Sequence, residues 1–114
     1  MSLSTSMLHL VRIALSFLVV SALPAPAIAA EYVPGMTCHE VGGFAEAVIV
    51  EKSLGDSLKE QISGMRQSIP AYPRTQAALE KIIRSIYANP ALRKASPDDV
   101  GKAYERACMV LAGP

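Results

Sequence analysis

The sequence predicts an all-α protein, a small four-helix up-and-down bundle closed by one disulfide. Four segments carry apolar residues every three or four positions, which is the spacing of one face of a helix. Capping residues, glycine or proline bound each of these segments. No alternation of apolar and polar residues long enough for a strand remains. The two cysteines lie near opposite ends of the helical region, where one covalent link would join the ends.

Residues 1–29 are predicted to be a cleaved signal peptide. Arg12 precedes an apolar run, Ile13 to Leu23, and Ala27 and Ala29 then offer a small-residue cleavage site. The apolar run is too short to cross a bilayer core of about 30 Å. We therefore expect residues 30–114 to form a single helical domain, exported by a bacterium to the periplasm or secreted, with no stable membrane anchor in its mature form.

The first predicted helix covers residues 38–53. Thr37 and Glu40 have the spacing of a capping box, and the apolar residues after them share one face: Val41, Phe44, Ala45 and Val48. Gly42 and Gly43 each cost about 1 kcal/mol inside a helix. Either the first turn is irregular, or another backbone packs closely against these glycines.

The second predicted helix is shorter. Gly55 ends the first helix, and we expect Asp56 to cap the second. Its apolar residues are separated by three and four positions and lie on one face: Leu58, Ile62 and Met65. The run from Ser68 to Pro73 then interrupts the helical pattern.

The last two predicted helices begin with proline. Pro73 can occupy the first turn of the third helix, whose face comprises Thr75, Leu79, Ile82, Ile83 and Ile86. Asn89 and Pro90 end it. The run from Ser96 to Asp99 then starts a fourth helix, which Gly113 closes, with a stripe comprising Val100, Ala103, Tyr104, Ala107, Cys108 and Leu111.

Cys38 and Cys108 are predicted to form a disulfide, since both belong to the exported part of the chain. An up-and-down arrangement of four helices brings the two ends of the chain to the same side. The link would close a loop of about 70 residues, which the chain-entropy relation values at roughly 4 kcal/mol. This is comparable to the net stability of a domain of this size.

The neighbouring Cys38 and His39 raise the alternative of a thiol and its base. A free thiol at a helix N-terminus would have a lowered pKa, but adjacent helical residues point about 100° apart. We therefore favour the structural disulfide and predict no catalytic residues. A haem attachment site would need a cysteine where Gly35 stands, and one histidine with two oxidised thiols cannot build a metal site. No hydrolase, phosphate-binding or metalloprotease motif is present. The prediction is a protein that is not an enzyme and uses no cofactor or metal.

Charge is balanced in the mature chain but unevenly distributed. Residues 31–60 hold six acidic residues against Lys52 and Lys59, whereas residues 61–94 hold six basic residues against Glu80 alone. This layout suits an oriented contact with another protein better than binding to nucleic acid, which favours a strong overall positive charge. The candidate partner-binding residues are Arg66, Arg74, Lys81, Arg84, Arg93 and Lys94.

The segment NPALRKASPDDVGKAYERAC, residues 89–108, resembles the C-terminal part of Rap1a/Tai-type periplasmic immunity proteins. That resemblance implies a helical, disulfide-bonded inhibitor of a secreted cell-wall amidase. The whole chain is also similar to small secreted helical proteins of Proteobacteria. In architecture alone, it resembles small periplasmic acid-stress chaperones held by one disulfide.

The expected function is a protein-binding module whose partner is another periplasmic or secreted protein, such as a secreted hydrolase that it inhibits. Two alternatives stay open. The first is an acid-stress chaperone, because protonation of ten acidic residues below about pH 4 would leave the chain strongly cationic. The second is a carrier of a lipid or small ligand in a pocket lined by Met36, Met65 and Met109.

Overall fold

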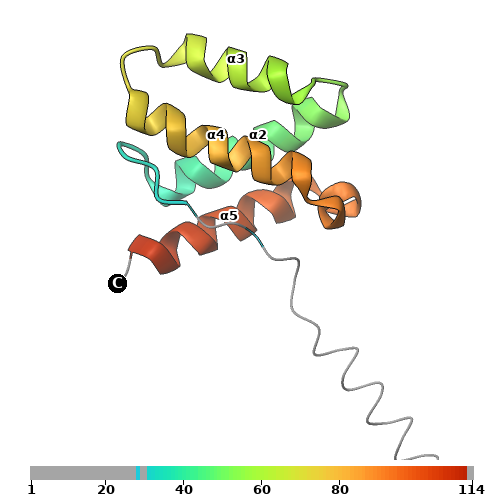
Figure 1. Cartoon of the computed structure of the whole chain (residues 1–114). Helices are drawn as coiled ribbons and strands as arrows, with labels where there is room; N and C mark the ends of the chain where they lie inside the picture. The colour runs from blue at the N-terminus through green and yellow to red at the C-terminus, as the bar shows by residue number, and fades with distance from the viewer. Residues whose placement is uncertain (1–27, 29–30, 113–114) are drawn as a thin grey trace, which may run out of the picture.

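A computed structural model describes residue 28 and residues 31–112. In this part of the chain the α-helices are α2 (Cys38–Ser53), α3 (Leu58–Ser68), α4 (Pro73–Ala88) and α5 (Pro97–Ala112), with the 3₁₀ helix η1 (Pro90–Lys94) before α5. Successive α-helices run in opposite directions (Figure 1). The predicted all-α, four-helix up-and-down bundle is therefore confirmed. The signal-peptide prediction falls, apart from Ile28, outside the described residues, as does the predicted cap at Gly113.

The first helix begins as predicted, and the second begins one residue later than predicted. Thr37 and Glu40 form the expected capping box of α2. The prediction that Asp56 caps α3 is wrong. The N-cap is Ser57, whose Oγ accepts a hydrogen bond from the backbone N–H of Glu60 at 3.1 Å, while its own N–H donates to Glu60 Oε1 at 3.2 Å. This reciprocal pair needs an acidic residue three positions after the cap, and Asp56 has Lys59 there.

The other helix boundaries follow the predicted signals. Gly55 ends α2 with a positive φ of 103°. Pro73 occupies the first position of α4. Ser96 accepts a hydrogen bond from the N–H of Asp99 at 3.1 Å, so its side chain caps α5.

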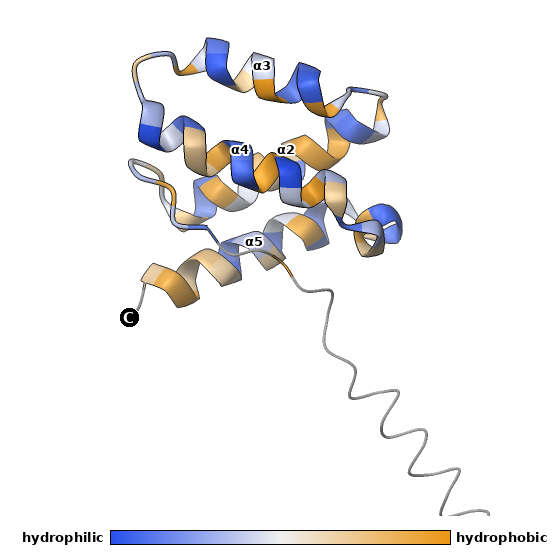
Figure 2. Ribbon diagram, viewed as in Figure 1, coloured by the Kyte–Doolittle hydropathy of each residue, from blue (hydrophilic) through white to orange (hydrophobic). Residues whose placement is uncertain are grey.

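The predicted apolar faces meet in one core, which comprises Val33, Val41, Ala45, Val48, Ile49, Ile62, Met65, Ala78, Leu79, Ile82, Ile83, Ile86, Leu92, Val100, Tyr104 and Cys108. The predicted apolar stripe of α5 extends beyond the core at the C-terminal end of the helix. Leu111 is 53% exposed, because α5 continues there past the side chains it could pack against. Figure 2 shows apolar residues on both α2 and α4, and hydrophilic residues on η1.

Helices α2 and α5 cross with their backbones almost in contact. A Cβ placed on Gly42 would lie 2.7 Å from the carbonyl oxygen of Gly101, and one on Gly101 would lie 3.0 Å from the oxygen of Gly42. Gly43, by contrast, faces open space. The close backbone approach considered from the sequence is therefore present, and Gly42 is the residue that permits it.

The disulfide between Cys38 and Cys108 is confirmed. It joins the start of α2 to the last turns of α5, with a Cα–Cα distance of 5.4 Å. These two helix ends lie at the same end of the bundle (Figure 1). Together, the crossing and the disulfide fix α2 and α5 as one antiparallel pair.

A buried polar group connects the remaining helices, and the sequence analysis did not foresee it. The side chain of Gln61, on α3, donates hydrogen bonds to the carbonyl oxygen of Val48 at 2.9 Å and to the hydroxyl of Tyr87 at 2.8 Å. That hydroxyl in turn donates to the carbonyl oxygen of Asp56 at 2.6 Å. Helices α2, α3 and α4 therefore share one hydrogen-bonded network.

Candidate protein-binding surface

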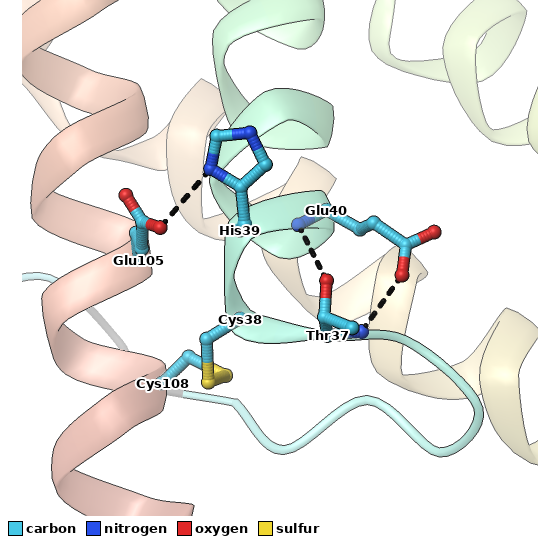
Figure 3. Close-up of polar contacts among 6 residues, drawn as sticks. All are labelled: Thr37, Cys38, His39, Glu40, Glu105 and Cys108. Carbon is cyan, nitrogen blue, oxygen red and sulfur yellow. Dashed lines mark hydrogen bonds and ion pairs between the residues drawn. A yellow bond between two sulfur atoms is a disulfide. The ribbon is translucent and has the colours of Figure 1, made fainter.

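The pair Cys38 and His39 does not form a thiol–imidazole dyad. The sulfur of Cys38 is bonded to that of Cys108, and the ring of His39 points toward α5, with Nδ1 3.1 Å from Oε1 of Glu105 (Figure 3). The ring is 90% exposed. His39 thus adds a surface contact between α2 and α5 beside the disulfide, and the TCHEVGG stretch ties the fold together.

The pKa shifts of Glu40 and Tyr104 arise from hydrogen bonds and burial within the fold. Hydrogen bonds from the backbone and hydroxyl of Thr37 lower the pKa of Glu40, which is the capping carboxylate of α2 (Figure 3). Burial raises the pKa of Tyr104, whose hydroxyl lies 2.6 Å from Oγ of Ser85. Among the described residues, no three His, Cys, Asp or Glu side chains form a group that could hold a metal ion.

The six candidate partner-binding residues belong to three elements, α3, α4 and η1. Arg66 belongs to α3, three others belong to α4, and the last two belong to η1, which directly follows α4; all six are exposed: Arg66, Arg74, Lys81, Arg84, Arg93 and Lys94. We call this set the basic surface. Helix α4 has 16 residues and is therefore about 24 Å long.

The basic residues differ in how they are paired. Arg66 donates a hydrogen bond to Oε1 of Glu80, and the guanidinium of Arg84 lies 3.8 Å from the same oxygen. Arg74, Lys81, Arg93 and Lys94 make no ion pair with any other residue in the described part of the chain. These four charges remain available to a partner.

A groove runs between α3 and α4 at the position of Arg66 and Arg84. Its volume is about 720 Å³, and its lining comprises Leu58, Lys59, Ile62, Ser63, Arg66, Gln67, Pro70, Glu80 and Arg84. We call it the α3–α4 groove. Neither Lys59 nor Glu80 is among the binding residues predicted from the sequence. The available signal for Glu80 was its spacing of four residues from Arg84, which is typical of an ion pair on a helix.

A second, mostly apolar pocket lies where the segment before α2 meets the ends of α3 and α4. It has a volume of about 540 Å³ and is lined by Pro34, Gly35, Met36, Phe44, Met65, Ser68, Ile69, Tyr72, Thr75 and Leu79. Met36 and Met65 therefore share a pocket, as the carrier hypothesis requires. Met109 does not, because it lies on α5 and is 57% exposed. Of the three methionines named in the carrier hypothesis, this pocket therefore brings together Met36 and Met65.

No family model, curated protein or solved structure matches the chain significantly. No helix among the described residues is long and apolar enough to cross a membrane.

Proposed function

We propose that this chain is a non-enzymatic protein-binding module, which binds an acidic surface of another exported protein through the basic surface. One observation carries the proposal. Arg74, Lys81, Arg93 and Lys94 are exposed on α4 and η1 and have no ion-pair partner among the described residues. Helix α4 contributes five buried residues to the core, so Arg74 and Lys81 project from a helix that is anchored in the bundle.

A protein partner explains the charge distribution better than nucleic acid or a membrane surface. The formal net charge of the whole chain is +1, so long-range attraction to a polyanion is weak. The acidic residues are concentrated in the first half of the described chain, which gives the molecule two oppositely charged regions. Complementary charge on a partner would orient the encounter and increase the association rate.

An exported location supports a more specific version of this function. A disulfide is compatible with an oxidising compartment, and the predicted leader would deliver the chain to the periplasm or the medium. The resemblance of residues 89–108 to periplasmic immunity proteins suggests a secreted hydrolase as the partner. In that role the module inhibits the hydrolase by covering an acidic part of its surface.

Partner capture tests the proposal. The oxidised mature protein is used as bait in the exported fraction of the bacterium that produces it, beside the double variant Arg74→Glu/Lys81→Glu. We expect the variant to lose the partner because two attractive contacts become repulsive. The matched control Lys102→Glu/Arg106→Glu makes the same change in net charge on α5 and should retain it. If the first variant keeps every partner at low salt, the proposal is wrong.

The apolar pocket favours a second candidate, a carrier of a small apolar ligand. Its volume lies within the range of about 300–1,000 Å³ that is usual for ligand sites. Native mass spectrometry of protein recovered from its own compartment should then show a bound molecule. A homogeneous ligand-free mass would count against the carrier.

A further inference from the structure

We propose that the α3–α4 groove receives a short acidic and apolar segment of the protein partner, and that Glu80 occupies the place of the partner's carboxylate until binding. This inference rests on the proposed function, which concerns the basic surface as a whole. The inference adds the position of the main contact and the chemistry of the partner segment. It also names Glu80 as the residue of this chain that competes with the partner's carboxylate.

Glu80 contacts two arginines at the groove. Its carboxylate lies between the guanidinium groups of Arg66 and Arg84, which come from opposite walls of the groove. Guanidinium groups bind carboxylates through parallel hydrogen bonds. The side chains of Arg66 and Arg84 are 56% and 58% exposed and that of Glu80 is 23% exposed, and ion pairs that are largely solvated contribute little stability. A carboxylate from a partner can therefore replace that of Glu80 with only a small loss of free energy from the broken ion pairs.

The lining of the groove indicates what accompanies the carboxylate. Its lining includes the buried Ile62 and the half-buried Leu58, together with three exposed cationic side chains, those of Lys59, Arg66 and Arg84. The lining therefore combines three cationic side chains and one acidic side chain with apolar side chains. The complementary ligand is an acidic side chain next to an apolar one. A volume of about 720 Å³ is enough for a few such side chains.

Selection from a random peptide library displayed on phage, with the oxidised protein as target, tests this proposal. We expect the selected peptides to be enriched in Asp or Glu beside an apolar residue. A synthetic copy of one selected peptide is then titrated by fluorescence anisotropy against wild-type protein and variants. Failure to select any peptide, or selection without acidic enrichment, overturns the proposal.

Substitution of Glu80 and substitution of its arginine partners should change peptide affinity in opposite directions. Glu80→Gln should bind the peptide about three- to tenfold more tightly, because the competing charge is gone. Arg66→Ala and Arg84→Ala should weaken binding by about tenfold or more. Arg106→Ala, an exposed arginine on α5, should have no effect. Since misfolding cannot increase affinity, the Glu80→Gln result does not depend on the stability of the arginine variants.

Several outcomes separate this inference from the proposed function. If Arg74→Glu/Lys81→Glu loses the natural partner but Arg66→Ala and Arg84→Ala bind the peptide normally, the basic surface functions and the groove proposal is wrong. Weaker binding by Glu80→Gln also overturns it. Vesicles containing phosphatidylglycerol serve as a separate probe. If the groove variants lose binding to these vesicles but not to the peptide, the groove is a phosphate site and the proposal fails.

Discussion

At the scale of single residues, two neighbouring glycines in α2 have different roles. Gly42 lies where a Cβ would come within 2.7 Å of the Gly101 carbonyl oxygen, whereas Gly43 has nothing within 4 Å of its Cβ position. The sequence identified both as unfavourable in a helix. It could not tell them apart, because the difference depends on where α5 crosses α2.

Replacing Gly42 by alanine should destabilise the protein. Alanine gains about 1 kcal/mol in helix propensity, but forcing two backbones apart costs about 1–3 kcal/mol. We expect a net loss of about 1 kcal/mol, the middle of the resulting range of about 0–2 kcal/mol, measured by urea unfolding with the disulfide intact. Gly43→Ala is the matched control and should stabilise the protein by up to about 1 kcal/mol. Equal effects of the two substitutions would contradict the close crossing.

Glu40 should contribute to the dependence of stability on pH. Hydrogen bonds from Thr37 hold its pKa below the ordinary value of 4.5 in the folded protein. Its contribution is therefore fully present above pH 4.5 and is lost as the pH falls through the lower folded pKa. The stability difference between wild type and Glu40→Gln should shrink over that interval. Unfolding curves collected between pH 2 and 6 measure it, and a constant difference would show that the carboxylate is not the linked group.

At the scale of elements, α3 depends on a single buried polar side chain more than the other helices do. Its buried residues are Gln61, Ile62 and Met65, and it is bordered by the α3–α4 groove. The side chain of Gln61 connects it to Val48 on α2 and to Tyr87 on α4. Loss of this connection should loosen α3 while leaving the covalently joined pair of α2 and α5 in place.

Gln61→Leu should therefore lower stability by about 1 kcal/mol, since it removes two hydrogen bonds but keeps most of the volume. Hydrogen exchange should accelerate in the amides of α3 more than in those of α2 and α5. The same substitution at the exposed Gln67 is the control and should change stability little. Uniform acceleration across all four helices would indicate that α3 has no independent mobility.

The helices were predictable from the sequence because their boundaries are encoded locally. Thr37 with Glu40, Pro73 and Ser96 mark starts that the structure reproduces. The prediction at Asp56 was wrong because Asp56 and its neighbour Ser57 are both common helix-capping residues. Ser57 is the cap because it has Glu60 three positions later, whereas Asp56 has Lys59. The Gln61 network and the pairing of Arg66 with Glu80 were not predictable. Both join residues from different helices, whose relative rotation no local pattern specifies.

At the scale of the whole molecule, the disulfide closes nearly all of the helical region into one loop. The sequence separation of 70 residues corresponds to roughly 4 kcal/mol of stabilisation through the unfolded state. The double variant Cys38→Ala/Cys108→Ala should lose about this amount, measured as a lower midpoint of urea unfolding. A change of less than about 1 kcal/mol would show that the four helices are stable without the link.

In the proposed function, the disulfide stabilises the helical bundle, and the bundle presents the basic surface to an acidic exported protein. Arg74 and Lys81 are separated by two helical turns of α4, so their relative position is maintained only while the bundle stays folded. The disulfide stabilises the bundle and therefore favours the folded state in which this surface is presented.

The intact mass of the protein, recovered without reducing agent from its native compartment, tests that account most directly. We predict the mass of a chain that begins near Ala30 and lacks the hydrogen atoms of both thiols, with Cys38 and Cys108 linked in one peptide after proteolysis. Recovery with both thiols free would contradict the account and return Cys38 and His39 to consideration as a reactive pair.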